Sequence, residues 1–162
     1  MNIRPAAALE IDIIMDIYDH AKRYMNETGN STQWIDGYPC QSNIMNDIYN
    51  GHCFVGVDDS NIPHFVFAFI IGEEPTYSSI THGEWQNSDK YGTIHRLASD
   101  GMVHGVFKMC LEFCLALISN IRIDTHADNL IMQHLIKKNQ FKRCGIIYVA
   151  NGSERIAYQL KK

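Results

Sequence analysis

The stretch that decides the fold is Tyr91–Thr125, which reads YGTIHRLASDGMVHGVFKMCLEFCLALISNIRIDT. Its first part, Tyr91–Ala98, has the composition of a β-strand, and an apolar helix is predicted over Val103–Ile118. A second short strand is predicted at Ile121–Thr125. A strand, a crossover helix and a second strand form a βαβ unit, so we expect parallel strands and a right-handed crossover.

Further elements are predicted on both sides of this unit. Upstream, the patterns indicate a short strand at Met1–Arg4, helices at Ala8–Asn26 and Ile44–Tyr49, and a hairpin of Cys53–Val57 and His64–Ile71. Downstream, they indicate a helix at Asn129–Lys138, a strand at Phe141–Val149 and, after the Asn151-Gly152 turn, an antiparallel strand at Arg155–Leu160. The sequence therefore predicts a mixed α/β sheet with helices on its faces.

Length and composition narrow the possible functions. The 162 residues are 46% hydrophobic, which suits one domain spanning residues 1–162. A net charge of -4 and the lack of a basic stripe argue against nucleic-acid binding. The longest apolar runs, such as Phe65–Ile71, are too short to span a membrane, and no signal-type run is present at the start. We therefore expect a cytoplasmic protein.

Cysteines and histidines show no spacing typical of a metal site. The five cysteines are odd in number, and Cys110 and Cys114 on the apolar helix are expected as small core residues. No pair among the eight histidines has the helical spacing of a zinc protease motif. We therefore expect no metal.

The turn between the first strand of the βαβ unit and its helix is one candidate site. It carries Gly101 and Gly105, with His104 and Lys108 nearby. Free backbone N–H groups at a helix start attract phosphate or pyrophosphate. An ordinary strand-to-helix turn can also contain two glycines, so this motif leaves both interpretations open.

Two histidines are candidates for proton transfer. His95 lies on the first strand of the unit, and His126 follows the second strand within Asp124-Thr125-His126. Neighbouring parallel strands would bring both to the sheet edge where α/β proteins bind ligands, and histidine exchanges protons near neutral pH. A hydrogen-bonded structural role is the alternative. Since side chains alternate along a strand, Arg96 is expected on the face opposite His95.

Two long irregular segments, 32–43 and 72–90, are rich in aromatic side chains, which could wall a pocket or fill the core. These aromatic residues are Trp34, Tyr38, Tyr77 and Trp85, with Tyr91 just beyond. Glu73, Glu74 and Glu84 in the second segment would favour a cationic acceptor.

The order of these features resembles the GNAT N-acetyltransferase superfamily over nearly the whole chain. The similarity is carried by Ile3-Arg4-Pro5 with Asp12–Ala21, by Ile94–Ser99 with Gly105 and its helix, and by Asp124–Asn129 with Leu135–Phe141 and Cys144-Gly145. This resemblance implies a central mixed sheet of six or seven strands. Its parallel fourth and fifth strands splay apart, and helices cover both faces.

The resemblance also implies acetyl-CoA as co-substrate, with its pantetheine arm between Tyr91–Ser99 and Ile121–Thr125. Backbone groups of Leu97, Ala98 and Ser99 would pair with that arm, and Asn129 would meet it. Amides in the loop and first helical turn would hold the pyrophosphate, and the residues concerned are Val103, His104, Gly105, Val106, Phe107 and Lys108. Acceptor-binding residues are expected among the irregular segments, namely Trp34, Tyr38, Tyr77, Glu84 and Trp85.

The implied activity is direct acetyl transfer to a primary amine of a small molecule or peptide. His95 matches a position where some members carry a base, and His126, oriented by Asp124, is the second candidate. Two departures keep alternatives open: only Gly105 remains of the loop pattern, and Ile136 stands where members carry a proton-donating tyrosine. The alternatives are a weak or inactive acyl-CoA-binding module and an interaction domain without ligand. Edge strands near the C-terminus could pair in a homodimer.

Overall fold

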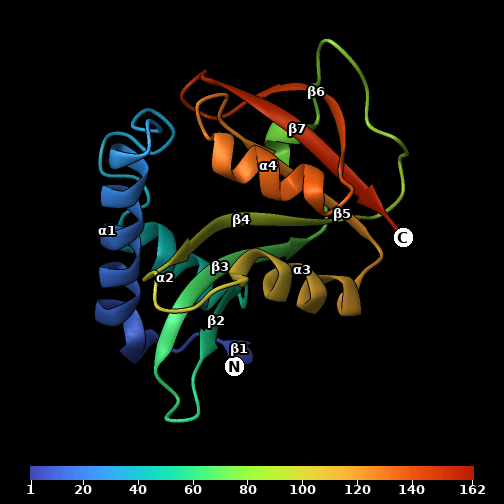
Figure 1. Cartoon of the computed structure of the whole chain (residues 1–162). Helices are drawn as coiled ribbons and strands as arrows, with labels where there is room; N and C mark the ends of the chain where they lie inside the picture. Colours follow the sequence, from blue (N-terminus) through green and yellow to red (C-terminus); the bar gives the residue numbers. More distant parts are fainter.

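The β-rich runs of the sequence assemble into one mixed sheet in the computed structural model, which describes residues 1–162 (Figure 1). The strands are β1 (Asn2–Pro5), β2 (Cys53–Val57), β3 (Pro63–Ile71), β4 (Gly92–Ser99), β5 (Asn120–Thr125), β6 (Lys142–Tyr148) and β7 (Glu154–Lys161). They lie in the order β1-β2-β3-β4-β5-β7-β6 in a seven-stranded sheet. The expected GNAT-like α/β architecture is confirmed.

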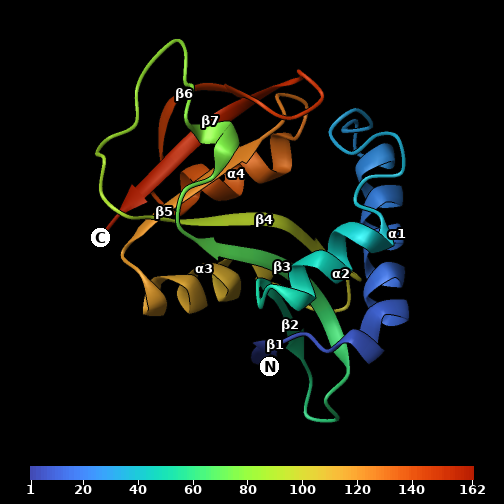
Figure 2. The same ribbon diagram turned by 180° about the vertical axis from the view of Figure 1, so that it is seen from behind.

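Helices cover both faces of this sheet (Figures 1 and 2). They are α1 (Ile11–Glu27), α2 (Gln41–Tyr49), α3 (Val106–Leu117) and α4 (Leu130–Lys138), with short 3-10 turns at Ala8–Glu10 and Pro75–Tyr77. One face packs under α3 and α4, where Phe65, Phe67 and Tyr158 are fully buried. The other face packs under α1 and α2 through residues such as Ile14 and Val55.

The parallel pair β4 and β5 is joined at one end only. Gly92 pairs with Ile121 and Thr93 with Arg122, and no further pairs follow. From Ile94 onward the two strands part, as the resemblance predicted. The edge of β4 that faces β5 across this wedge therefore has no strand partner from Ile94 to Ser99.

A β-bulge interrupts β4 just where it parts from β5. Ala68 on β3 faces His95 and Val66 faces Ala98, so two β4 residues, Arg96 and Leu97, lie opposite one β3 residue. Arg96 adopts a left-handed conformation with φ of 52°. Because a bulge breaks the alternation of side chains, the prediction that Arg96 points away from His95 is wrong, and both line the same cavity.

The start of α3 also differs from the prediction. Val103 and His104 belong to the preceding turn, and the helix begins at Val106. Gly105 at the cap position has a φ of 76°, which a residue with a side chain adopts only at a cost. The glycine therefore ends the turn and sets the direction of the helix.

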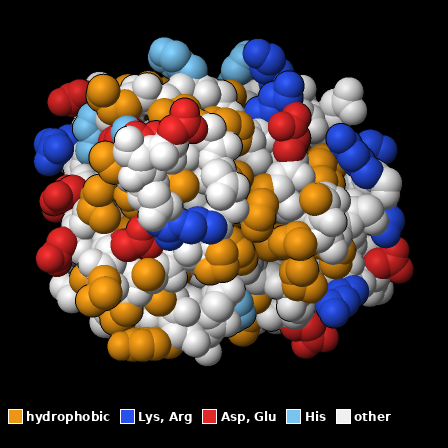
Figure 3. Space-filling view, turned by 90° about the horizontal axis from the view of Figure 1, so that it is seen from below, with side chains coloured by type: hydrophobic (Ala, Val, Ile, Leu, Met, Phe, Trp, Pro, Cys, Tyr) orange, Lys and Arg blue, Asp and Glu red, His pale blue; other side chains and the backbone are white.

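The surface carries a number of exposed apolar side chains. Figure 3 shows several groups of them separated by charged side chains on the face seen from below. None of the helices combines the length and hydrophobicity needed to cross a membrane.

Candidate active site

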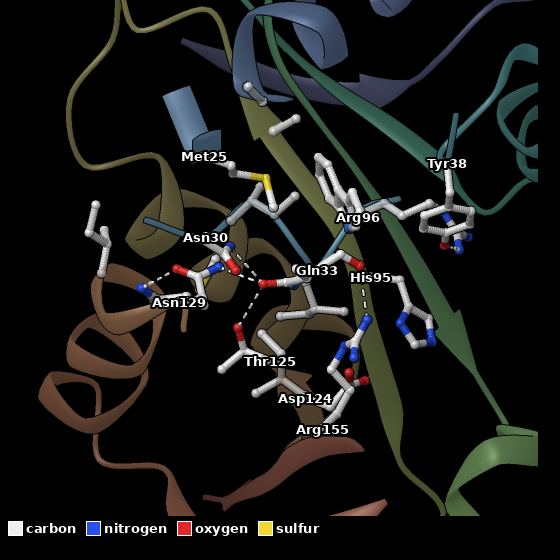
Figure 4. A pocket seen from close by; sticks show the side chains of 18 of the residues that line it. Met25, Asn30, Gln33, Tyr38, His95, Arg96, Asp124, Thr125, Asn129 and Arg155 are labelled. Atoms are coloured by element: carbon white, nitrogen blue, oxygen red, sulfur yellow. Dashed lines mark hydrogen bonds between the residues drawn. The ribbon is translucent and has the colours of Figure 1, made fainter. Parts of the chain in front are cut away.

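A cavity of about 690 Å³ opens where β4 and β5 part (Figure 4). Ten of the residues predicted to bind substrates or to act in catalysis line it, namely Trp34, Tyr38, His95, Leu97, Ala98, Ser99, Val106, Phe107, Asp124 and Asn129. The C-terminal half of α1 and the segment that follows it also line the cavity. Fold elements from both halves of the chain therefore converge on one space.

Other predicted residues lie outside the cavity lining, and these are Tyr77, Glu84, Trp85, Val103, His104, Gly105, Lys108 and His126. Glu84 is exposed, and Trp85 packs on Tyr77 with ring centroids 5.0 Å apart. Trp85 and Tyr91 also sandwich the guanidinium of Arg122 at 4.1 and 3.9 Å. These aromatic side chains therefore attach the segment 72–91 to the sheet. Of the two predicted roles, wall of a pocket or part of the core, Trp85 and Tyr91 have the second.

His95 is held by a carboxylate from that same segment. Oε2 of Glu74 lies 3.0 Å from Nε2 of His95, and both side chains are mostly buried. The hydrogen bond with His95 lowers the pKa of Glu74 to about 2, against the effect of burial. An ionised carboxylate only accepts hydrogen bonds, so the neutral ring carries its hydrogen on Nε2. Nδ1 of His95 has no protein partner, and in that tautomer it is the nitrogen with the lone pair.

Asp124 is hydrogen-bonded to Tyr77 and not to His126, the partner that was predicted. Its Oδ1 accepts a hydrogen bond of 2.6 Å from the hydroxyl of Tyr77. Burial raises the pKa of Tyr77, and Asp124 adds to this effect, so the phenol stays protonated and donates. His126 instead accepts from the backbone N–H of Asp128 through Nδ1. The prediction that Asp124 orients His126 is therefore wrong. Asp124 lies on β5 and His126 just after it, and each side chain has a partner of its own.

Arg155 brings a positive charge to the same cavity from β7. It is 5% exposed and donates to the carbonyl of Gln33, the carbonyl of Glu154 and the hydroxyl of Ser153 at 2.7 to 2.9 Å. Figure 4 shows its hydrogen bond to Gln33 across the cavity. Sequence analysis missed this residue because a lone arginine at the start of a strand gives no signal of burial.

On the other face of the sheet, the start of α3 is open to an anion. Gly105 has no side chain to cap the helix, and no side-chain cap is present. The N–H groups of the first turn therefore have no intrahelical partners and carry the positive end of the helix dipole. Phe107 in the same turn is buried and packs on Phe141, with ring centroids 6.3 Å apart. The residues thus suit a bound pyrophosphate.

The turn before α3 is held in shape by its own side chains. Oγ of Ser99 accepts from the N–H of Gly101, and Oδ1 of Asp100 accepts from the N–H of Met102. Oδ2 of Asp100 in turn lies 2.7 Å from Nδ1 of His64 on β3. These contacts fix the approach to the uncapped helix start.

Asn129 is shared between α4 and the segment after α1. Its Oδ1 caps the helix by accepting from the N–H of Met132, and its Nδ2 donates to Oε1 of Gln33. The same Gln33 oxygen accepts from Asn30 and Thr125 (Figure 4). Gln33 therefore ties the segment after α1 across the mouth of the wedge, a role that nothing in the sequence signalled.

Ile136 is 0% exposed and lies in the core beneath α3 and α4. It does not line the cavity, whereas Met132 and Leu135 of the same helix do. A hydrocarbon side chain cannot donate a proton, so this position supplies no acid.

Comparisons with known proteins show which family has this fold. A GNAT-family acetyltransferase from Streptococcus agalactiae is 34% identical, with a TM-score of 0.88 over 99% of this chain and 95% of that one. The chain belongs to the GNAT acetyltransferase family. It is therefore an acyltransferase, and the cavity between β4 and β5 is its candidate active site.

More distant GNAT structures share the fold. A GNAT acetyltransferase from Listeria monocytogenes is 21% identical with a TM-score of 0.74, covering 99% of this chain and 94% of its own. The NatC complex bound to Gag peptide and CoA is 15% identical with a TM-score of 0.51, covering 99% and 98%. No model of a protein family and no curated protein matches the sequence.

Proposed function

We propose that this GNAT protein transfers the acetyl group of acetyl-CoA directly to the primary amine of a small molecule or peptide. The single observation that carries the proposal is the wedge between β4 and β5, with the Glu74–His95 pair on one face and the uncapped start of α3 on the other. One opening thus connects an anion site with a base.

The two faces of the sheet suit the two substrates. The free edge of β4 from Leu97 to Ser99 can pair with the amide groups of a pantetheine arm, and the first turn of α3 suits the pyrophosphate. The NatC structure of the same fold holds CoA. When bound, acetyl-CoA supplies a thioester that an amine can attack.

His95 acts as the general base in this proposal. Its Nδ1 lone pair takes a proton from the ammonium group of the acceptor, and Glu74 steadies the imidazolium that results. The orientation follows the logic of carboxylate–histidine pairs, in which the carboxylate fixes the ring and its tautomer. Glu74 is a positioning residue, since it acts through His95.

Transfer without an acyl-enzyme is favoured by the position of the cysteines. Cys53, Cys110, Cys114 and Cys144 are buried, and Cys40 is exposed at the start of α2. None of the five lines the cavity. The amine nitrogen therefore forms its bond with the acetyl carbon while the thioester C–S bond breaks.

The test combines binding with turnover. Calorimetry with acetyl-CoA should detect binding, and thiol release should follow when an amine panel is added. His95→Gln should lower kcat by about 10²- to 10⁴-fold and leave acetyl-CoA affinity unchanged. Binding of acetyl-CoA without thiol release for any amine would instead favour the alternative, an acyl-CoA-binding module without activity. That alternative stays open because the buried Ile136 cannot donate a proton.

A further inference from the structure

Two arginines line the cavity, and only one of them already has a counter-ion. Arg96 donates through Nε and Nη2 to the two carboxylate oxygens of Asp47 at 3.0 and 2.8 Å. Arg155 forms no ion pair and bonds only to two carbonyl groups and a hydroxyl. Since a buried charge without a counter-ion is costly, Arg155 favours an anion supplied by a ligand.

The guanidinium of Arg155 also has donors to spare. Of its five N–H groups, both on Nη1 and one on Nη2 have protein partners. The N–H on Nε and the second on Nη2 have none. Two free N–H groups on one planar guanidinium can hold a carboxylate through two charge-assisted hydrogen bonds.

Asp124 does not accept from these two N–H groups. Its carboxylate is close enough to raise the pKa of Arg155, but burial has the larger effect and the pKa is lowered overall. Asp124 is bonded to Tyr77 and makes no ion pair with Arg155. Asp124 therefore offsets part of the charge of Arg155 but leaves its two unpaired N–H groups free.

Arg155 lies on the acceptor side of the sheet. Ile156 and Tyr158, its neighbours along β7, pack into the core beneath α3 and α4. Side chains alternate along a strand, so Arg155 lies on the opposite face, away from the start of α3. Figure 4 shows it in the same cavity as His95.

We propose that the acceptor is a primary amine that also carries a carboxylate, and that Arg155 binds this carboxylate while the amine faces His95. The proposal rests on the acetyltransferase function above and narrows its substrate class. In the transfer, the N–C amide bond forms and the thioester C–S bond breaks. One ammonium proton goes to His95, and the second leaves with the thiol of CoA.

Matched pairs of acceptors test the proposal. Each pair has the same chain length and amine, with the carboxylate replaced by a neutral amide: glycine and glycinamide, β-alanine and β-alaninamide, 4-aminobutyrate and 4-aminobutanamide. For the pair whose length suits the cavity, kcat/KM should favour the acid by about 10- to 100-fold. Each acid-to-amide ratio is compared between enzyme variants, which cancels differences in amine basicity.

Substitutions at Arg155 should change that ratio specifically. In Arg155→Gln, the acid-to-amide ratio of kcat/KM should fall to the value set by amine basicity alone. Arg155→Lys should retain part of the preference for the acid. Arg143→Gln, the same change at an exposed site on β6, should leave the ratio unchanged. Thermal unfolding and acetyl-CoA affinity confirm that each variant is folded.

A binding measurement separates this proposal from the acetyltransferase function. Ligand-observed NMR with the same acids and amides is recorded on the CoA-saturated protein. Arg155-dependent binding of the acids without turnover supports the carboxylate site while contradicting the acetyltransferase function. Turnover without acid preference, or a preference that survives Arg155→Gln, overturns the carboxylate site and leaves the function intact. No preference for the acids in either measurement also overturns it.

Discussion

Oε2 of Glu74 lies 3.0 Å from Nε2 of His95, joining the connection between β3 and β4 to the middle of β4. The N–H of Glu74 is in turn bonded to the hydroxyl of Tyr91 at the base of the same strand. This second contact fixes the backbone of Glu74, so its carboxylate approaches the ring from one direction. The free Nδ1 of His95 is consequently the nitrogen available to an acceptor.

Removing the charge of Glu74 should slow the reaction through His95. We expect Glu74→Gln to lower kcat/KM by about 10- to 100-fold, less than His95→Gln, because the ring remains but is less well oriented. Glu73→Gln changes the exposed neighbouring carboxylate and should have little effect. Steady-state kinetics with acetyl-CoA measure these effects. Equal losses of kcat/KM in Glu74→Gln and Glu73→Gln would contradict the prediction.

Gly105 should matter for both stability and acetyl-CoA binding. At its φ of 76° an alanine costs about 1–2 kcal/mol in backbone strain, although no atom lies within 4 Å of the added methyl group. That methyl group would also stand at the start of α3 where the pyrophosphate is proposed to bind. Urea unfolding and calorimetry with acetyl-CoA measure the two effects.

Gly152 in the β6–β7 turn is the matched control for Gly105. It has a φ of 82° and equally open surroundings. Gly152→Ala should therefore lose similar stability and keep its affinity for acetyl-CoA. If both variants bind acetyl-CoA as the parent does, the pyrophosphate does not rest at α3.

His64 should make stability depend on pH. The hydrogen bond with Asp100 raises its pKa above 6.5, and Asp58 adds to the effect. A raised folded-state pKa means that this contribution is complete below pH 6.5 and is lost as the pH rises through the raised value. The stability difference between the parent and His64→Gln should therefore be largest near pH 6 and shrink toward pH 9.

Urea unfolding at a series of pH values measures this difference. His104→Gln alters an exposed histidine in the same region and serves as the control. A difference for His64→Gln that stays constant from pH 6 to 9 would mean that the ion pairs with Asp58 and Asp100 do not form.

Ile136 should behave as a core residue with no catalytic part. Ile136→Val should cost about 0.5–1.5 kcal/mol, the loss typical of one buried methylene. Ile136→Tyr should cost about 1–3 kcal/mol through overpacking and should not raise kcat, because the position faces the core. A gain in kcat with tyrosine would show that the side chain reaches the cavity after all.

Local patterns were sufficient to predict much of the fold. The apolar helix between two short strands fixed the βαβ unit, and the predicted helix start at Val103 lies three residues before the true start at Val106. The Asn151-Gly152 turn likewise placed the β6–β7 hairpin. These signals are local, so the sequence contains them directly.

The arrangement of the site depends on contacts between distant segments. The bulge at Arg96 needs the register of β3 against β4, which alternation alone cannot supply. The partners of His95 and Asp124, Glu74 and Tyr77, come from the irregular segment between β3 and β4. Loop geometry of this kind is set by packing, so the residue types were recognised but their pairing was not.

Only two residue pairs hold β4 to β5, so the sheet behaves as two ladders that share a short seam. The first ladder carries His95 and the start of α3, and the second carries Arg155 on β7, one arm of the β6–β7 hairpin. Mutations in that hairpin can redirect the charge of Arg155 while the thioester-handling half keeps its register. If Arg155 binds the acceptor as proposed, substitutions in the hairpin would change the choice of acceptor without altering the wedge or the start of α3.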